Sequence, residues 1–142
     1  MERPVHTSRE LTKDEMELVL KKQLHGRLGL CIEGEPYVVP VSYMYSEGAI
    51  YFHTAKRGKK IDFIEKNNRV CFEVDEWQRG WASVLCYGEI TLRDDFEAKS
   101  KGFKLLMGVD LPEERIKGAA VYIGIIDIEE MTGRCSVDFE FR

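Results

Sequence analysis

The sequence predicts a mainly β fold with a few flanking helices, arranged as a closed and mostly antiparallel barrel of six or seven strands. Two observations favour this class. Short runs of β-branched and aromatic residues are separated by turns of hairpin length. The regular strand–helix alternation that a doubly wound sheet requires is missing. With 142 residues and an apolar fraction of 44%, the chain is expected to form one domain, residues 1–142, with a sizeable core.

The amino-terminal part is expected to be an arm followed by a helix. Residues 1–10 show no periodicity and are predicted to form a flexible arm. Thr12 and Glu15 occupy the N-cap and N3 positions of a capping box. The apolar stripe that follows predicts a helix over residues 13–25, ended by Gly26. His25 is then expected at the carboxy-terminal end of this helix, where a cation is favourable.

Further strands and two helices are expected along the rest of the chain. Pro40 cannot donate to a ladder, so it marks either a bulge or an edge strand. Gly88 indicates a bulge, and Thr132 with Gly133 indicates a turn. The loop expected over residues 76–82 holds both tryptophans, as a cofactor lid, a subunit contact or ordinary packing. Strands are predicted over residues 27–32, 36–45, 69–75, 83–92, 120–128 and 135–141, and helices over 94–107 and 111–117.

The stretch 49–66 begins as a strand and ends as a helix. Four cations, Lys56, Arg57, Lys59 and Lys60, precede or open that helix. The helix macrodipole is already positive there, so this clustering is unfavourable unless an anion is bound. Free N–H groups at a helix start bind phosphate. The alternative is a solvated basic turn paired with acidic residues of the same helix, Asp62 and Glu65, and both interpretations stay open at this point.

Charge and composition exclude several other classes. The net charge of −4 gives no reason to expect nucleic acid as a partner, and a local basic run on an acidic protein suits a small anion. No apolar run is long enough for a membrane span, and the first residues do not resemble a signal peptide. Four separated cysteines without a C-x-x-C pair are expected to be buried free thiols, with no metal site. We therefore expect a soluble cytoplasmic protein.

The familiar catalytic motifs are missing. The sequence contains no G-x-G-x-x-G after a strand, no P-loop around Gly58 and no G-x-S-x-G elbow. If the protein is an enzyme, a bound cofactor is expected to supply the reactive atoms while the chain positions it.

Four segments resemble a known family. They are VVPVSYMY (38–45), EGAIYFHTAKRGKKIDFI (47–64), RVCFEVD (69–75) and SVLCYGEI (83–90). In order and spacing they are similar to the FMN-binding split-barrel proteins. Within these they resemble the pyridoxamine 5'-phosphate oxidase-related group and its nitroimidazole-resistance branch. The resemblance extends from the first helix to about residue 107. It implies a six- to seven-stranded antiparallel split β-barrel that forms a homodimer with its FMN sites at the subunit interface.

The resemblance also implies which residues bind the cofactor. The segment Val39, Pro40, Val41, Ser42 and Tyr43 would run along the isoalloxazine ring with backbone hydrogen bonds. Thr54, Lys59 and Lys60 would bind the phosphate within a segment that includes Ala55 and Lys56, and His53 would lie beside the ribityl chain or the flavin. Trp81, Ser83 and Val84 would approach from the partner subunit or across the cleft.

Two departures from the family pattern limit this transfer. Ala82 stands where many relatives carry a polar or basic residue. The carboxy-terminal segment, GRCSVDFEFR, lacks the Arg-x-His arrangement that holds pyridoxamine phosphate, so vitamin B6 oxidation is not expected.

The expected function is that of an FMN-dependent oxidoreductase. Electrons would pass from a small-molecule donor, such as a reduced nicotinamide, through the flavin to a small electrophilic acceptor such as a nitroaromatic. His53 is the one catalytic candidate, as a proton donor or orienting group, with a structural role at a strand end as the alternative. A non-catalytic module that binds flavin or haem is the alternative function. A deazaflavin is an alternative ligand, because a basic phosphate pocket does not distinguish it from FMN.

Overall fold

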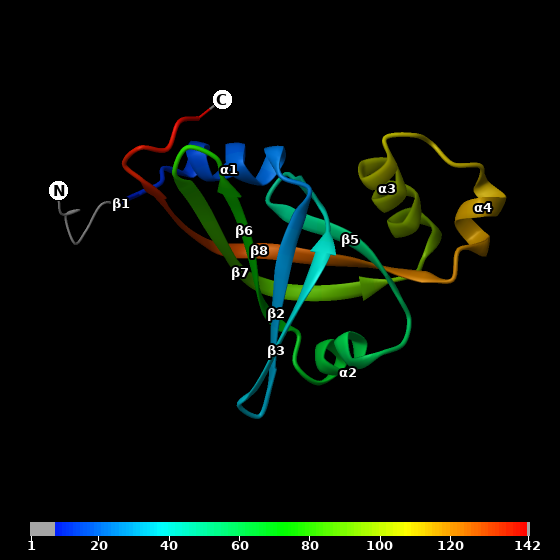
Figure 1. The fold of residues 1–142 in the computed structure, drawn as a ribbon. Coiled ribbons are helices and arrows are strands. Elements are labelled where there is room, and N and C mark those ends of the chain that lie inside the picture. The colour runs from blue at the N-terminus through cyan, green and yellow to red at the C-terminus, as the bar shows by residue number, and fades with distance from the viewer. Residues whose placement is uncertain (1–7, 142) are drawn as a thin grey trace.

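The computed structural model describes residues 8–141 as one strongly curled antiparallel sheet with helices around it (Figure 1). Helix α1 lies across one end of the sheet, α2 lies near the other end, and α3 and α4 extend to one side. The elements are β1 (Ser8–Glu10), α1 (Lys13–Lys22), β2 (His25–Ile32), β3 (Glu35–Ser42), β4 (Met44–Ser46), β5 (Ala49–Ala55), α2 (Lys59–Lys66), β6 (Arg69–Trp77), β7 (Trp81–Arg93), α3 (Phe96–Met107), α4 (Glu113–Gly118) and β8 (Val121–Ser136).

The sheet topology confirms the predicted fold class, with eight strands in place of six or seven. The strand order is β3-β2-β6-β7-β8-β5-β4, and β1 adds to β8. Among the described residues no strand pair joins β3 to β4, so the ring is split and the expectation of full closure is wrong. These two end strands are nevertheless consecutive in the chain, and Tyr43 alone separates them. The predicted single strand over 36–45 therefore breaks at Tyr43, because its two halves pair at opposite ends of the sheet.

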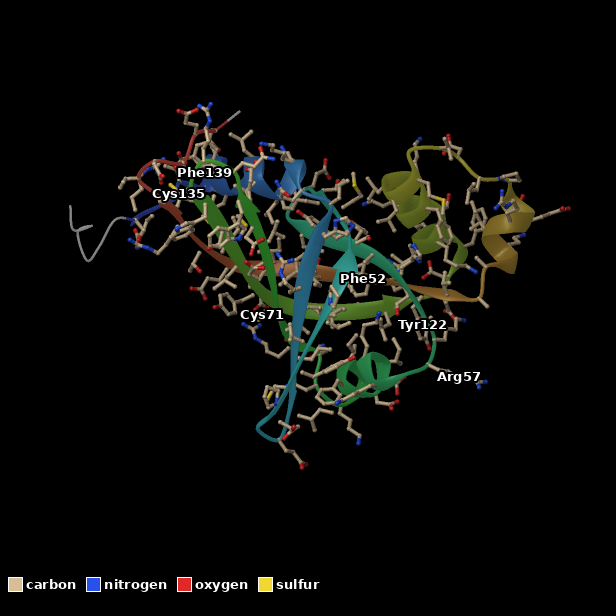
Figure 2. The ribbon with its side chains drawn as sticks, viewed as in Figure 1. Phe52, Arg57, Cys71, Tyr122, Cys135 and Phe139 are labelled. Atoms are coloured by element: carbon tan, nitrogen blue, oxygen red, sulfur yellow. The ribbon has the colours of Figure 1, made fainter. Side chains whose placement is uncertain are left out.

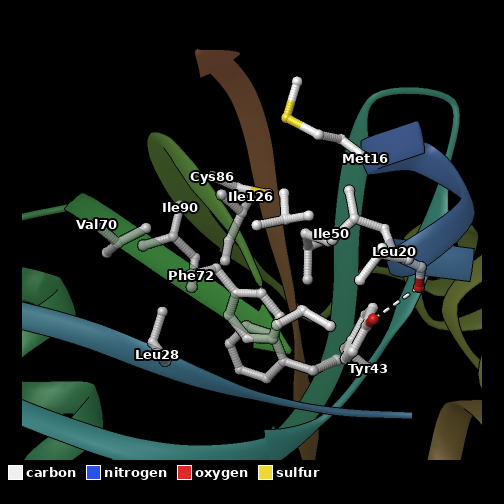
Figure 3. Packing of buried hydrophobic residues seen from close by; sticks show 14 of the residues in the cluster. Met16, Leu20, Leu28, Tyr43, Ile50, Val70, Phe72, Cys86, Ile90 and Ile126 are labelled. Carbon is white, nitrogen blue, oxygen red and sulfur yellow. Dashed lines mark hydrogen bonds between the residues drawn. The ribbon is translucent and has the colours of Figure 1, made fainter. Parts of the chain in front are cut away.

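Tyr43 is anchored in the core that the curled sheet encloses together with α1 (Figure 3). Its side chain is 2% exposed, and its hydroxyl donates a hydrogen bond to the backbone carbonyl of Leu20, 2.6 Å away. Its ring meets Phe72 edge-on at 5.1 Å between centroids. Burial raises the pKa of the Tyr43 phenol. The remaining large, fully buried side chains include Phe52, Leu28, Ile50, Ile90, Ile126, Val74 and Val84.

Helix α1 begins as predicted and ends earlier. The capping box is confirmed: the Glu15 N–H donates to Thr12 Oγ1 at 3.2 Å, and the Thr12 N–H donates to Glu15 Oε1 at 2.9 Å. The helix ends at Lys22 with Gln23 as its C-cap. His25 opens β2 by pairing with Ser42, so its predicted place at the end of the helix is wrong. His25, which the apolar stripe assigned to the helix, instead belongs to the β2–β3 ladder.

Strand pairing decides between the alternatives left open for Pro40 and shortens the predicted tryptophan loop. Strand β3 lies at one end of the sheet, and its register with β2 is uninterrupted through Pro40, so the edge interpretation is confirmed and the bulge is not. The loop predicted over 76–82 is shorter, because Trp77 and Trp81 pair across a tight hairpin. Arg79 and Gly80 both adopt positive φ in the turn.

Strand β8 is one continuous element from Val121 to Ser136, so the predicted turn at Thr132 and Gly133 and the separate strand over 135–141 are wrong. The glycine serves a close approach of α1. A β-carbon at Gly133 would lie 2.9 Å from Met16 Cγ and 3.0 Å from Leu11 Cδ1. The bulge predicted at Gly88 is confirmed by a register shift between Tyr87 and Gly88.

The amino-terminal arm and the cysteines complete the comparison with the sequence. Residues 8–10 form β1 against β8, and the rest of the predicted arm, residues 1–7, lies outside the described residues. Cys86 and Cys135 are buried and Cys71 is half-buried, whereas Cys31 is exposed, contrary to expectation. Within residues 8–141, no helix is long and apolar enough to cross a membrane.

Candidate anion and cofactor site

The amino terminus of α2 is open to a ligand. Gly58 is its N-cap, with φ of 122°, a conformation that side chains rarely adopt, and no side chain caps the helix. The first helical hydrogen bond runs from the N–H of Asp62 to the carbonyl of Gly58 at 3.0 Å. The N–H groups of Lys59, Lys60 and Ile61 precede that bond and lack an intrahelical partner. Converging free N–H groups of this kind bind anions.

The four cations around this helix start differ in their partners. Lys56 Nζ lies 2.8 Å from Asp94 Oδ2, and this hydrogen bond raises the pKa of Lys56. Within the part of the chain that the structure describes, no carboxylate pairs with Arg57, Lys59 or Lys60. The Arg57 side chain extends into solvent (Figure 2). The basic turn is therefore not paired with Asp62 or Glu65 of α2, as the alternative interpretation required.

Aromatic rings lie beneath the two helix lysines instead of carboxylates. Lys59 Nζ is 4.7 Å from the ring centroid of Tyr37 and 5.7 Å from that of Phe63. Lys60 Nζ is 5.9 Å from the Phe52 ring centroid. Lys60 is half-buried, and this desolvation lowers its pKa. A partly desolvated ammonium without a carboxylate partner is stabilised by an incoming anion.

The end of β5 contributes residues on both faces of the sheet. Thr54 is 5% exposed and faces the barrel interior, and its hydroxyl donates to the carbonyl of Ala55 at 3.2 Å. His53 and Ala55 are exposed on the opposite face, as strand alternation requires. The His53 ring lies 6.3 Å from the Phe103 ring of α3. His53 and Thr54 therefore point away from each other, toward different surroundings.

The segment of β3 that the sequence singled out lies on a free sheet edge. Val39 and Val41 pack partly against the core, while Pro40 and Ser42 are exposed. Among the strands of the described residues only β2 pairs with β3, so within this part of the chain the other side of β3 keeps unpaired N–H and carbonyl groups. The contact between Tyr37 and Lys59 joins this strand to the start of α2. The structure thus places the first half of β3 beside the start of α2, and the segment Val39–Tyr43 runs from there toward α1.

Trp81, Ser83 and Val84 lie at the opposite end of the barrel. Strand β6 leads away from α2, and the eight residue steps from Arg69 to Trp77 span about 26 Å. Figure 1 shows the β6–β7 hairpin beside α1, away from α2. Val84 is fully buried and offers no surface to a ligand within one chain. Trp81 and Ser83 line a cavity of about 400 Å³ together with Met131, Arg134 and six other residues. Within one chain these residues do not reach Lys59.

Sequence reasoning missed Tyr37, which no motif marked. It stands beside Pro36 in β3 and meets Lys59 only because β3 and α2 adjoin in the fold. A contact between residues that far apart in the chain leaves no local signal. Trp77, which the sequence did single out, is 71% exposed at the hairpin and stacks at 6.2 Å between centroids on Trp81.

The fold and this site define a class of split β-barrel protein with an uncapped, cationic helix start beside a free sheet edge. The sequence profile described as pyridoxamine 5'-phosphate oxidase matches residues 12–135. The chain belongs to the pyridoxamine 5'-phosphate oxidase family.

Solved structures and a curated sequence resemble the chain over most of its length. A FAD-binding protein of Mesorhizobium loti is 30% identical, with 92% of this chain and 99% of that chain covered and a TM-score of 0.77. A protein of Bacteroides thetaiotaomicron, described as a candidate 5-nitroimidazole antibiotic resistance protein, shares the fold. Its TM-score is 0.81 at 21% identity, covering 90% of this chain and 87% of the other. An uncharacterized protein of Rhizobium meliloti is 26% identical, covering 90% of this chain and 95% of its own length.

Proposed function

We propose that this protein is an FMN-binding flavoprotein that reduces a small electrophilic acceptor, with nitroaromatic compounds as the first class to test. One observation carries the proposal. Within residues 8–141, Lys59 and Lys60 have no carboxylate partner, and they stand at the uncapped start of α2 beside Tyr37 of the edge strand β3. A phosphate monoester matches two neighbouring cations and a set of free N–H groups. A flavin is favoured because the Mesorhizobium loti relative is described as FAD-binding.

The residues at the start of α2 fit the phosphate of such a ligand in charge and in hydrogen-bond donors. Lys59, Lys60 and the first N–H groups of α2 would hold the phosphate, and Thr54 lies at the adjacent strand end. The backbone of β3 that faces away from β2, along Val39–Ser42, would bind the polar edge of the ring. Flavin, when bound, supplies the electron transfer, so no protein nucleophile is required. His53 is exposed at the end of β5, where its imidazole would be the candidate group to hold or give a proton.

We also propose that the protein acts as a homodimer with its cofactor sites between subunits. Trp81 and Ser83 do not reach α2 of their own chain, so a second copy is needed to bring them to it. An apolar groove of about 610 Å³ supports this arrangement. It crosses the outer face of β3, β2, β6 and β7, and its lining includes Val38, Cys31, Cys71 and Tyr87. A second copy of this chain would cover the groove, as apolar surface of this kind favours burial.

The absorption spectrum of the purified protein tests this function first. A flavin spectrum is expected, with FMN identified by mass after release. A haem or deazaflavin spectrum would instead select one of the alternative ligands. Anaerobic reduction by a reduced nicotinamide, followed by reoxidation with a nitroaromatic, then tests turnover. A protein that binds FMN tightly and fails to reoxidise with any acceptor is a binding module. Failure to bind FMN at all, after reconstitution, would refute the proposal.

A further inference from the structure

Tyr37 of β3 places its aromatic ring beneath the ammonium group of Lys59. The distance from Lys59 Nζ to the ring centroid is 4.7 Å, and a second ring, Phe63 of α2, lies 5.7 Å from the same nitrogen. The two rings contact each other at 5.2 Å between centroids. We propose that Tyr37 is a positioning residue for phosphate binding, which holds the Lys59 ammonium at the start of α2 ready for the anion. The inference rests on the phosphate site proposed above.

An aromatic ring holds a lysine differently from a carboxylate. A carboxylate neutralises the ammonium and occupies one or two of its three donors, which an incoming phosphate would then have to displace. The Lys56 ammonium is neutralised in this way by Asp94, which lies 2.8 Å away. The face of a ring attracts the ammonium through its quadrupole and accepts no conventional hydrogen bond. Lys59 therefore keeps its charge and its donors for the ligand while its flexible side chain is restrained.

The rings themselves are fixed by the fold. Phe63 is 8% exposed and belongs to the core, and Tyr37 is half-buried against the same core. Because Tyr37 is on β3 and Phe63 is on α2, their contact also fixes the free strand edge relative to the helix start. The lysine thus occupies a defined position between the two segments proposed to bind the ring and the phosphate of one ligand.

The test is a double-mutant cycle measured on FMN affinity. Tyr37→Leu is expected to weaken FMN binding about twofold to fivefold, the size of an exposed cation–π contact. Tyr37→Phe keeps the ring and should bind FMN as the wild type does. In the Lys59→Ala background, Tyr37→Leu should not weaken FMN binding further. Riboflavin lacks the phosphate, so its affinity should be the same for Tyr37→Leu as for the wild type. Phe96→Leu is the matched control, since Phe96 lies 5.7 Å beneath Lys117 in the α3–α4 region.

Separate outcomes overturn the inference and the function on which it rests. If Lys59→Ala leaves FMN affinity unchanged, the phosphate site itself is wrong. If Lys59→Ala weakens FMN binding and Tyr37→Leu does not, or weakens it equally in both backgrounds, only the role of Tyr37 is wrong. If Tyr37→Leu does not fold, proton NMR of the wild-type protein tests the contact between Lys59 and the Tyr37 ring. The ε-methylene protons of Lys59, assigned by their loss in Lys59→Arg, should be shifted upfield by the ring current in the wild-type protein, and unshifted protons would contradict the proposal.

Discussion

The hydroxyl of Tyr43 donates a hydrogen bond to the backbone carbonyl of Leu20 at 2.6 Å, which fastens the one residue between β3 and β4 to the end of α1. Leu20 lies in the last turn of that helix, where carbonyl groups lack an intrahelical donor. A side chain from the break between two strands thus completes the hydrogen bonding of a helix.

Removal of that hydroxyl should destabilise the fold. Tyr43→Phe leaves the Leu20 carbonyl buried without its donor, at an expected cost of about 1–3 kcal/mol in the free energy of unfolding. Urea denaturation followed by circular dichroism measures this. Tyr87→Phe is the control, because within residues 8–141 the half-buried Tyr87 hydroxyl makes no hydrogen bond. Equal losses in the two variants would contradict a specific role for the Tyr43 bond.

Loss of both helix lysines should abolish flavin retention. Lys59→Ala with Lys60→Ala removes two charge-assisted contacts to phosphate, so FMN affinity is expected to fall on the order of 100-fold. Fluorescence quenching of FMN on titration with protein measures it. Lys56→Ala is the matched control. The Lys56 ammonium is already paired with Asp94, so the FMN affinity of this variant should change by less than about threefold. Wild-type affinity in the double variant would show that the phosphate binds elsewhere.

The bulge at Gly88 should tolerate no side chain. A β-carbon there would overlap the carbonyl oxygen of Asp127 on β8. Gly88→Ala is therefore expected to destabilise the protein by about 1–3 kcal/mol. Gly118→Ala serves as the comparison, since nothing lies within 4 Å of its β-carbon and alanine favours the helix. Thermal or chemical denaturation of both variants decides between a steric requirement and a general intolerance of glycine replacement.

Glu15 should make stability depend on pH in the acidic range. Two hydrogen bonds from Arg9, at 2.9 and 2.7 Å, together with the Thr12 N–H, lower the pKa of Glu15 to about 2 from its ordinary 4.5. The unfolded chain therefore binds the proton first, and stability present above pH 4.5 is lost as the pH falls toward about 2. Melting temperatures over this range should fall more steeply in the wild type than in Glu15→Gln, which keeps an oxygen for Thr12. Parallel curves would show that this pair contributes nothing.

Sedimentation velocity should show a dimer of the 142-residue chain. Val38 is 65% exposed in the single chain, so Val38→Glu should leave the fold intact. Since Val38 lines the apolar groove, a buried carboxylate there should shift the protein toward monomer and weaken flavin retention. Met107→Glu, at a 52% exposed position on α3, should remain dimeric. A flavin-loaded wild-type monomer would contradict the interface proposal.

Features set by nearby residues could be predicted from the sequence. The capping box of Thr12 and Glu15 and the bulge at Gly88 each follow from the chemistry of one or two neighbouring residues, whereas Pro40 alone left open whether its strand bulges or lies at an edge. The break at Tyr43 and the unbroken course of β8 could not be predicted, because they depend on which strands pair across the sheet. Gly133 illustrates the difference: its lack of a side chain suggested a turn, whereas it makes room for α1.

The same limit applies to the candidate site. The cluster of cations around Gly58 could be located from the sequence, and so could the helix that follows it. By charge alone Lys56, Lys59 and Lys60 are equivalent, and only the family resemblance singled out Lys59 and Lys60. Only the fold shows that Lys56 is paired with Asp94, 38 residues away, while Lys59 rests on Tyr37. Which cation is available to an anion is decided by tertiary partners.

The course of β8 also constrains the order in which the chain can acquire structure during synthesis. Strands β1, β5 and β7 all pair with β8, although β1 precedes it by more than a hundred residues. As the polypeptide leaves the ribosome, the hairpins β2–β3 and β6–β7 can form from what has already emerged. The edges of β1, β5 and β7 that face β8 must wait until residues 121–136 emerge from the exit tunnel. A nascent chain paused before that point would present three unpaired strand edges to chaperones.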